Sequence, residues 1–361
     1  MAQALSLARL ALGQVSPNPA VGAVIVKDGE VIGEGYTQPP GLDHAEVVAL
    51  KQAGTRAQGG VMYVTLEPCC HYGRTPPCTQ AIIEAGISEV HLATIDVNPL
   101  VSGRGKEALE RAGIRVHVGE SEEEAKQINE AYAKFITEGT PFITTKFAMS
   151  LDGKIATKFG DSRWISGELS RKLVHQLRYT VDAVMVGVNT VLADDPRLTA
   201  RCGGKGGTLK KQPTRVIIDS KGRTPLTARV FTEPGKAVLV LGRTASPEEK
   251  ESLAQVGAEV MELPSPEGRV DLKRLLVVLG ERGVTSVMVE GGGILLGSLF
   301  DGGLVDKVIC FIAPIIIGGR NAKMAVAGEG VERVADSLKL ERVSVERLDE
   351  DLMVSGYVRG R

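Results

Sequence analysis

Hydrophobic and polar positions alternate in two ways along the first 140 residues. Two apolar runs, "VGAVIV" and "EVIGEGY", flank Asp28-Gly29, a pair that predicts a β-hairpin between them. Further apolar runs then alternate with stretches of helical periodicity, which predicts an α/β layered domain with a partly parallel sheet. The later strands are expected at "VMYVTL", "EVHLATID" and "IRVHVG", and the helices near His44, near Thr79, over "KEALERAG" and, as one acidic helix, over "ESEEEAKQINEAYAKFITEG".

The same alternation starts again after "TPF" at residues 140–142, which we take as a domain boundary. The stretch "FITTKFAMSLDGKIAT" predicts a second β-hairpin, with its turn at Asp152-Gly153. Strands and helices then alternate to the end of the chain, so we expect α/β domains at residues 1–140 and 141–361. The stretch "RCGGKGGTLKKQPT" has no packing pattern and is expected to form a mobile surface loop.

Length and charge restrict the classes of function. A chain of 361 residues is too long for one ordinary domain and is comfortable for two. The formal net charge is -1 and only 4% of residues are aromatic. A protein that holds a polymeric nucleic acid by its phosphates needs a basic excess, so such a partner is disfavoured.

Location and cysteine chemistry follow from the absence of targeting patterns. The stretch "MAQALSLARLALGQVSPNP" fits an amphipathic helix and lacks a secretory signal, and no apolar span is long enough to cross a membrane. We therefore expect a cytoplasmic protein with reduced thiols, in which clustered cysteines bind metal and do not form disulfides. The five cysteines are Cys69, Cys70, Cys78, Cys202 and Cys310.

Two stretches bring together residue types that bind catalytic metals. His44 and Glu46 lie at a predicted helix start, where both could also be ordinary helix-start residues. Downstream, the loop "TLEPCCHYGRTPPC" holds three of the cysteines. Zinc nucleobase deaminases carry His-x-Glu followed by Pro-Cys-x-x-Cys, and a catalytic zinc has three protein ligands and one open position. Cys69 keeps the Pro-Cys pattern, but the next loop cysteine that fits, Cys78, follows at a longer spacing.

These residues stand in longer motifs that continue through both halves of the chain. The motifs are "VSPNPAVGAVIVKDG", "HAEV", "EPCCHYGRTPPC", "DVNPLVSGRG", "KFAMSLDGKIAT", "DSRWISG", "VGVNTVLADDPRLTAR" and "VEGGG". Through them the chain resembles, over nearly its whole length, the bifunctional deaminase/reductase family of riboflavin biosynthesis. The resemblance implies a cytidine-deaminase-like three-layer α/β/α domain followed by a dihydrofolate-reductase-like α/β domain.

The resemblance also implies two consecutive reactions on one small phosphoribosyl-pyrimidine. The first domain would use Zn²⁺ to deaminate 2,5-diamino-6-(5-phosphoribosylamino)pyrimidin-4(3H)-one. The second domain would use NADPH to reduce the ribosyl side chain, which gives 5-amino-6-(5-phosphoribitylamino)uracil. No nucleic acid or membrane is an expected partner, and apolar strands such as "VICFIAPIII" are compatible with a homodimer or homotetramer.

For the deaminase, the resemblance assigns zinc to His44, Cys69 and Cys78 and proton transfer to Glu46. Cys70 is expected to support the site without binding the metal. Substrate contacts are implied for three further residues, each of which could instead serve turn geometry. These residues are Asn18, His71 and Arg74.

For the reductase, a glycine run after an apolar strand could offer backbone N–H groups to a cofactor pyrophosphate, or could simply form a tight turn. The resemblance favours the cofactor. The implied NADPH contacts are Ala148, Trp164, Thr190, Asp194, Ser220, Gly292, Gly293, Ile294, Leu295, Leu296, Gly297 and Ser298. The implied substrate contacts are Ser162, Arg178, Leu198, Arg201 and Glu290.

Three other functions compete with this interpretation. A nucleic-acid or free-nucleoside deaminase with an unrelated second domain would show the short Cys-x-x-Cys spacing and a basic, aromatic face, and the sequence has neither. A structural zinc protein would need four ligands, and only Cys70 could supply the fourth. Loss of activity in one domain is disfavoured because both sets of motifs are intact.

Overall fold

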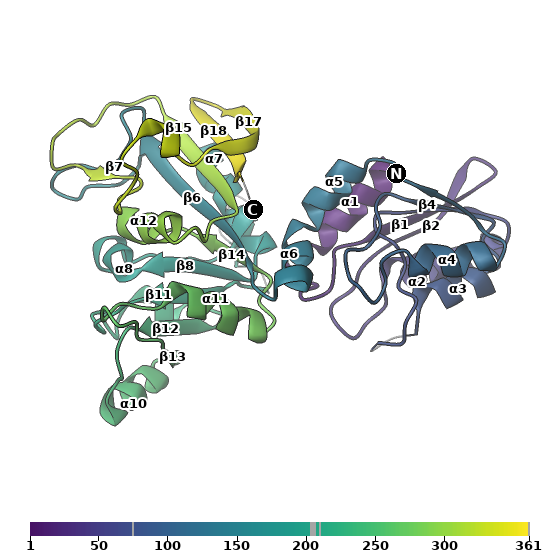
Figure 1. Ribbon diagram of the computed structural model, residues 1–361, viewed down its shortest axis with the longest axis horizontal. Coiled ribbons are helices and arrows are strands. Elements are labelled where there is room, and N and C mark those ends of the chain that lie inside the picture. The colour runs from purple at the N-terminus through teal and green to yellow at the C-terminus, as the bar shows by residue number, and fades with distance from the viewer. Residues whose placement is uncertain (74–75, 203–206, 209–210, 360–361) are drawn as a thin grey trace. The chain divides into compact units, whose positions relative to one another are not determined.

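The hydrophobic runs of the sequence form two large, separate sheets in a computed structural model, which describes residues 1–73, 76–202, 207–208 and 211–359 (Figure 1). The chain divides into two compact units, Met1–Thr140 and Pro141–Arg361. None of the helices in the described part of the chain has the length and hydrophobicity that a membrane span requires.

The first unit contains a five-stranded sheet with the strand order β2-β1-β3-β4-β5. Strands β1 and β2 form the predicted hairpin and β1 pairs antiparallel with β3, whereas β3, β4 and β5 are parallel. The sheet is therefore partly parallel, as the alternating pattern predicted. The strands are β1 Gly22–Lys27, β2 Glu30–Tyr36, β3 Val61–Val64, β4 Glu89–Leu92 and β5 Arg115–Val118.

Helices pack closely on both faces of this sheet, which makes the unit a three-layer α/β/α domain. On one face a Cβ at Gly22 would lie 1.9 Å from the backbone oxygen of Ala4 in α1. On the other face a Cβ at Gly35 would lie 2.3 Å from that of Ala45 in α2. Glycines thus permit the close approach of both layers. The helices are α1 Ala2–Ala11, α2 Ala45–Ala53, η1 Gly54–Ala57, α3 Cys78–Glu84, α4 Arg104–Arg111, α5 Glu122–Ile128 and α6 Glu130–Glu138.

The prediction of one continuous acidic helix at the end of this unit is wrong. Asn129 separates α5 from α6, and its φ of -106° lies outside the helical range. The buried Asn129 amide accepts a hydrogen bond from the N–H of Ala20 (2.8 Å) and donates one to the Ala20 carbonyl (3.0 Å). The Asn129 side chain thus provides hydrogen bonds to the distant backbone of Ala20, and the helix is interrupted at Asn129.

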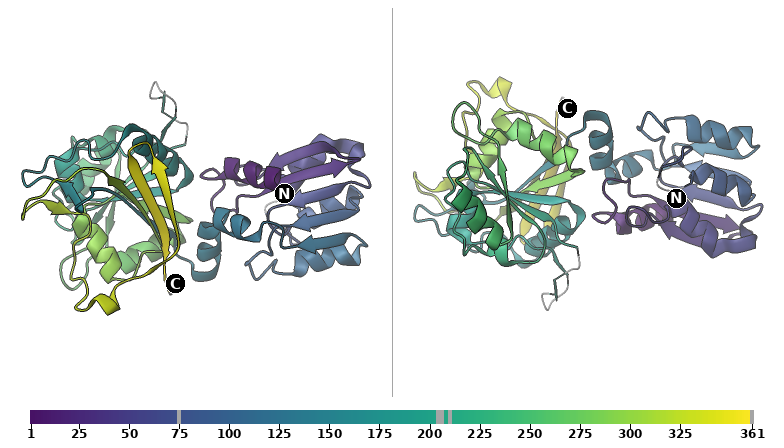
Figure 2. Two further views of the ribbon diagram at one scale, coloured as in Figure 1. Left: turned by 90° about the horizontal axis from the view of Figure 1, so that it is seen from above. Right: turned by 90° about the horizontal axis from the view of Figure 1, so that it is seen from below.

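The second unit contains a nine-stranded sheet with the order β13-β12-β11-β8-β14-β6-β15-β18-β17. The strands from β13 to β15 are parallel, and the last two are antiparallel. Helices lie on either side of its twisted strands (Figure 2). The strands are β6 Phe142–Ser150, β8 Ala183–Gly187, β11 Thr214–Ile218, β12 Ala237–Leu241, β13 Ala258–Glu262, β14 Ser286–Val289, β15 Lys307–Ala313, β17 Leu340–Leu348 and β18 Asp351–Val358.

Both faces of the central parallel strands are buried, as is typical of parallel sheets. Ala183 and Met185 of β8 belong to one hydrophobic cluster, whereas the alternate residues Val184 and Val186 belong to another. The helices of this unit are α7 Glu168–Thr180, α8 Val188–Asp194, α9 Arg229–Thr232, α10 Pro247–Gln255, α11 Leu272–Glu281, α12 Gly293–Asp301 and η2 Val334–Asp336.

The predicted turn at Asp152-Gly153 is present, but the expected pairing of the strands that flank it is wrong. Strand β7 (Lys154–Ala156) pairs with β16 (Lys323–Met324) and not with β6. Strand β6 already pairs with β14 and β15. The Asp152 carboxylate accepts hydrogen bonds from the N–H groups of Ile317 (3.0 Å) and Gly318 (2.8 Å), which directs the chain toward the β16 segment.

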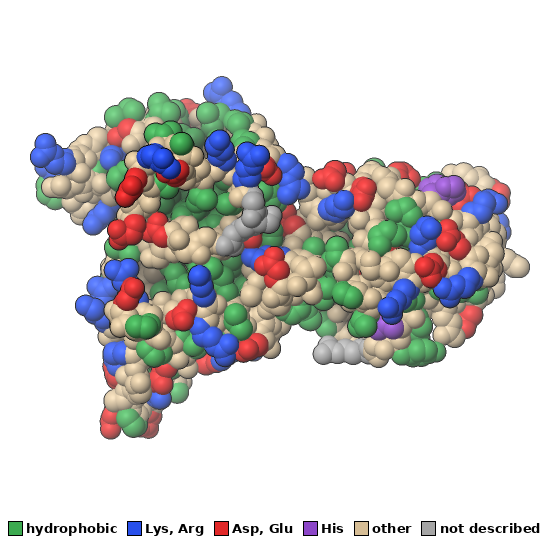
Figure 3. Space-filling model, in the orientation of Figure 1, with side chains coloured by type: hydrophobic (Ala, Val, Ile, Leu, Met, Phe, Trp, Pro, Cys, Tyr) green, Lys and Arg blue, Asp and Glu red, His purple; other side chains and the backbone are tan. Residues whose placement is uncertain are grey.

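The stretch 201–214, expected to be a mobile loop, contains two short described strands. These are β9 (Arg201–Cys202) and β10 (Gly207–Thr208), which pair antiparallel. Residues 203–206 and 209–210 lie outside the described residues. Acidic and basic side chains are interspersed on the molecular face in Figure 3, so this face does not offer a continuous basic surface to a polyanion.

Candidate functional sites

Three metal-binding side chains converge in the first unit. His44 directly precedes α2, Cys78 is the first residue of α3, and Cys69 lies in the loop between β3 and α3. The His44 Nδ1 lies 3.2 Å from the Cys78 Sγ and 3.6 Å from the Cys69 Sγ. All three ligand atoms lie within 4.8 Å of one another. We call these residues the thiolate triad; one imidazole and two thiolates fit a zinc site with an open fourth position.

Glu46 lies beside the thiolate triad, in the first turn of α2, and is only 3% exposed. Burial raises the pKa of its carboxyl to about 7, and the nearby Cys69 thiolate acts in the same direction. The Cys78 thiol donates a hydrogen bond that lowers the pKa of Cys69 to about 4. A carboxyl with a pKa near neutrality can both accept and release a proton, as general acid/base work requires.

Glu67 fixes the loop that carries Cys69, a role that the sequence analysis missed. Its buried carboxylate accepts hydrogen bonds from the backbone N–H groups of Asp96 (3.2 Å), Gly103 (3.0 Å) and Lys106 (2.9 Å). A carboxylate with several N–H donors is strongly anchored. The sequence signal was present, since Glu67 is a charged residue between an apolar strand and the Pro-Cys pair.

The other predicted residues of this unit have different surroundings. His71 has a buried Nδ1 without a hydrogen-bond partner among the described residues, which favours contact with a ligand. The backbone N–H of Asn18 donates to Val15 O (2.8 Å) in a turn. Arg74 lies outside the described residues. Cys70 Sγ donates to the carbonyl of Leu100 (3.7 Å), away from the triad.

A hollow of about 390 Å³ opens beside His44. This volume is large enough for a small molecule, and the hollow adjoins His44, a proposed zinc ligand. The residues that line it are Asp43, His44, Val47, Tyr72, Pro76, Pro77, Gln80, Ala81 and Glu84.

In the second unit the structure brings together Lys146 of β6, Arg178 of α7 and Glu290, which follows β14. Arg178 donates from Nε to Glu290 Oε1 (2.6 Å) and from Nη2 to Oε2 (2.9 Å). Lys146 Nζ lies 3.8 Å from Glu290 Oε2. Burial raises the pKa of Glu290, but Arg178 and Lys146 outweigh it and hold the pKa below its ordinary value. This carboxylate is therefore ionised and fixed in position.

Arg178 also reaches the segment between α8 and β9, because its Nη1 donates to the Thr199 carbonyl (3.1 Å). Arg201 donates from Nε to the Thr199 hydroxyl (3.0 Å). Arg178 is thus engaged through all three nitrogens within the protein, whereas the contact of Arg201 uses only its Nε. The sequence analysis gave no role to Thr199, which has no distinguishing sequence signal.

Predicted cofactor and substrate contacts also meet in this unit. Ser162 Oγ donates to Asp194 Oδ1 (2.9 Å), and the N–H of Gly292 donates to Thr190 Oγ1 (3.1 Å). Gly292 precedes α12, which begins without a side-chain cap. An uncapped helix start leaves N–H groups available for an anion such as a pyrophosphate.

Several other predicted cofactor contacts lie within α12, where their side chains differ in exposure. The side chains of Leu295 and Leu296 are buried in the core, whereas Ile294 is 64% exposed. Gly297 packs against Ala327, since a Cβ at Gly297 would lie 2.1 Å from the Ala327 oxygen.

The remaining predicted residues lie in varied settings. Trp164 is 70% exposed and lies 4.7 Å from the Arg171 guanidinium, measured to the ring centroid. Ser220 Oγ accepts from the N–H of Val270 (3.3 Å). Leu198 is buried and has a φ of +56°. Ala148 is partly buried in β6. Ser298 Oγ donates a hydrogen bond to the Ile294 carbonyl (3.1 Å).

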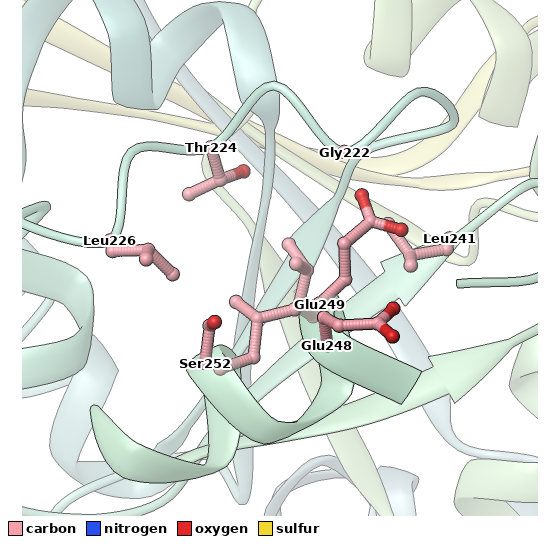
Figure 4. A pocket seen from close by; sticks show the side chains of 9 residues that line it. Gly222, Thr224, Leu226, Leu241, Glu248, Glu249 and Ser252 are labelled. Carbon is pink, nitrogen blue, oxygen red and sulfur yellow. The ribbon is translucent and has the colours of Figure 1, made fainter. Parts of the chain in front are cut away.

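A second hollow, of about 290 Å³, lies beside α10 and near the residues that follow Ser220 (Figure 4). It combines apolar side chains with the carboxylates of Glu248 and Glu249, so it is unsuited to a phosphate group. None of the predicted cofactor contacts lines it. The residues that line it are Gly222, Thr224, Leu226, Leu239, Leu241, Glu248, Glu249, Ser252 and Leu253.

Two known domain families match the two units. Residues 1–94 match the cytidine and deoxycytidylate deaminase zinc-binding region, and residues 141–354 match the RibD C-terminal domain. Together with the thiolate triad, they define a two-domain enzyme in which a zinc-binding deaminase domain precedes a reductase domain. The predicted fold class is confirmed.

Similar proteins extend over the whole chain. The riboflavin biosynthesis protein RibD of Aquifex aeolicus is 45% identical over 354 residues, which cover 98% of this chain and 96% of that protein. The chain belongs to the RibD family, and it is a bifunctional deaminase and reductase of riboflavin biosynthesis. The function predicted from the motifs is confirmed.

Two solved structures share this architecture. Acinetobacter baumannii RibD, form 1, has a TM-score of 0.87 and 37% identity, and the match covers 99% of this chain and 97% of that chain. The second structure is the diaminohydroxyphosphoribosylaminopyrimidine deaminase/5-amino-6-(5-phosphoribosylamino)uracil reductase of Thermotoga maritima. It has a TM-score of 0.85 and 37% identity, with the same coverage of 99% and 97%.

Proposed function

We propose that residues 1–140 deaminate 2,5-diamino-6-(5-phosphoribosylamino)pyrimidin-4(3H)-one and that residues 141–361 then reduce its ribosyl group with NADPH. The product is 5-amino-6-(5-phosphoribitylamino)uracil. The observation that carries the proposal is the thiolate triad with the buried Glu46 beside it. The substrates named for the Thermotoga maritima protein support the same reaction pair.

In the deaminase site His44, Cys69 and Cys78 would hold the zinc, which would supply an activated water for attack on the ring carbon that carries the amino group. Glu46 accepts the proton of that water and delivers protons to the ring nitrogen and to the leaving ammonia. The C–O bond forms first, as the ring nitrogen takes a proton, and the C–N bond to the amino group then breaks, so ammonia leaves and no redox change occurs. His71, whose Nδ1 has no hydrogen-bond partner within the described part of the chain, contacts the substrate.

In the reductase site the charged residues position the sugar phosphate. Bound NADPH supplies the hydride for the ribose C1 carbon. Glu290, fixed by Arg178 and Lys146, accepts hydrogen bonds from the sugar hydroxyl groups. The hydrogen bond of Arg201 to Thr199 uses only its Nε, so the two Nη groups of Arg201 contact the phosphate. Arg178 uses all three of its nitrogens for hydrogen bonds within the protein, so it acts mainly to position Glu290 and not as a substrate contact.

The cofactor side of this site consists of Thr190, Asp194 and the start of α12 at Gly292. The hydrogen bond from Ser162 to Asp194 joins the proposed substrate and cofactor contacts. Hydride transfer needs the donor and acceptor carbons held close together and shielded from water, so positioning dominates the rate. The other predicted cofactor contacts remain part of this proposal. We further propose that the protein is cytoplasmic and forms a homodimer or a homotetramer.

The direct test supplies the diaminopyrimidine phosphate to the zinc-loaded full chain, with and without NADPH, and identifies the products by mass spectrometry. We expect ammonia release without NADPH and a further gain of two hydrogens only with it. Ammonia release from free nucleosides but not from this phosphate would contradict the proposed substrate. Loss of ammonia without subsequent reduction would contradict the reductase assignment.

A further inference from the structure

A second group of metal-binding side chains lies on the sheet of the first unit. Glu89 and His91 of β4 and His117 of β5 project from the same face of the sheet, because their positions alternate with Val90 and Leu92, which are buried in the core with the helices of the opposite face. Strand β5 is the edge strand of the sheet. Figure 3 shows exposed histidine side chains on this unit.

The three side chains are already close enough for a shared ion. Glu89 Oε1 lies 2.8 Å from His91 Nε2 and 3.5 Å from His117 Nε2, and all three ligand atoms lie within 4.8 Å of one another. His91 and His117 are direct neighbours in the parallel register, and their rings stack with centroids 4.8 Å apart. Tyr63 stacks on the other side of His91 at 4.6 Å. The positions of both rings are thus limited by stacking.

Neighbouring charges orient these ligands. Arg115 donates from Nη2 (2.6 Å) and Nε (3.1 Å) to Glu89 Oε2, which leaves Oε1 directed at the histidines. Hydrogen bonds from Arg115, and then from His91, lower the pKa of Glu89, so the carboxylate is ionised. His91 Nδ1 lies 3.6 Å from Glu120 Oε2. A carboxylate behind a histidine ligand fixes the orientation of the ring in metal sites.

We propose that Glu89, His91 and His117, which we call the strand triad, form a second site for a divalent transition-metal ion. Two imidazoles and one carboxylate are a ligand set that zinc accepts, with an open position for water. His117 is 56% exposed, so an ion enters directly from solvent. The ion links β5 to β4 and stabilises the edge of the sheet, since a ligand that binds only the folded state raises stability. This site has no part in the proposed deamination.

The test measures zinc binding by the full chain. After chelator treatment and dialysis, the protein is titrated with Zn²⁺ and its bound metal and thermal unfolding are recorded. We expect two equivalents per chain in the wild type and a rise in Tm as the second binds. His117→Ala should weaken binding of the second equivalent at least about tenfold and abolish its effect on Tm. The first equivalent should be retained.

A control and a spectroscopic probe separate the two sites. Val118→Thr changes an exposed side chain of β5 that is neither a ligand nor one of the charged groups that orient the ligands, so it should keep both equivalents. Co²⁺ at the thiolate triad gives thiolate charge-transfer absorption, which Co²⁺ at the strand triad lacks. If the thiolate triad bound no metal, the single remaining equivalent would disappear in His117→Ala, so the two assignments fail separately. Only one equivalent in the wild type, held with thiolate absorption, or a second that survives His117→Ala, would overturn the strand triad.

Discussion

The two sites each contain a buried carboxylate, and the structure gives the two carboxylates opposite properties. Glu46 is buried beside thiolates, and burial raises its pKa to about 7. The Glu290 side chain is only 8% exposed, yet Arg178 and Lys146 outweigh its burial and lower its pKa. The comparison teaches that burial alone does not assign a role: a carboxyl buried beside thiolates can carry protons, whereas one clamped by an arginine and a lysine serves as a fixed anion.

The sites also differ in how the chain assembles them. The thiolate triad comes from two helix starts and the loop before one of them, all within residues 44–78. The reductase cluster joins Lys146, Arg178 and Glu290 from three separate elements. Because the two clusters lie in different units, a change in one should affect one reaction only. The following predictions test this independence.

Zinc removal should have the largest effect. Chelation should abolish ammonia release, because all three ligands belong to the first unit, while reduction of the supplied deaminated intermediate should remain nearly unchanged. Both rates are measured on one preparation, with zinc added back as the control. If both reactions stopped while the circular dichroism spectrum was unchanged, the independence of the sites would be wrong.

Glu46→Gln should lower the deamination rate at least about a hundredfold, because the amide keeps the size of the side chain but cannot carry a proton. Zinc content, measured by atomic absorption, should stay the same, and reduction should be unaffected. Glu107→Gln, at an exposed carboxylate of the same unit, is the matched control. Turnover near the wild-type rate would remove Glu46 from the mechanism.

Glu290→Gln should lower kcat/KM for reduction by at least about tenfold, which corresponds to loss of one charge-assisted hydrogen bond. Deamination should be unchanged. Steady-state kinetics with purified deaminated intermediate measures the effect. Glu281→Gln, at an exposed position of the same unit, is the control. Unchanged constants in Glu290→Gln would place the reductase site elsewhere.

Asp194→Asn should have the smallest effect. Asparagine can still accept the Ser162 hydrogen bond, so we expect KM for NADPH to rise by about twofold to tenfold with little change in kcat. The neighbouring Asp195→Asn, whose carboxylate pairs with Arg229 at 3.0 Å, is the control and should leave KM unaltered. A change in the substrate KM alone would move Asp194 from the cofactor side to the substrate side.

The sequence predicted the layered α/β architecture well because hydrophobic periodicity is a local property of the chain. Its errors occurred where a distant partner decided the outcome. Asn129 interrupts a helix because it bonds to Ala20, 109 positions away. Strand β7 does not pair with β6, because β6 already pairs with β14 and β15. In addition, Asp152 accepts a hydrogen bond from backbone that lies far along the chain.

The sequence by itself determined the chemistry of the first unit: a histidine, a glutamate and two cysteines supply the residue types of a catalytic zinc site, and the longer motifs around them resemble the deaminase/reductase family. Only the tertiary structure decided which charges meet. Arg178 could have been a solvated helix residue, but packing brings it to Glu290, 112 positions away. Arg215 is fully buried and donates to the carbonyls of Val230 and Pro234. Such contacts depend on the order and register of whole sheets, which leave no local pattern in the sequence.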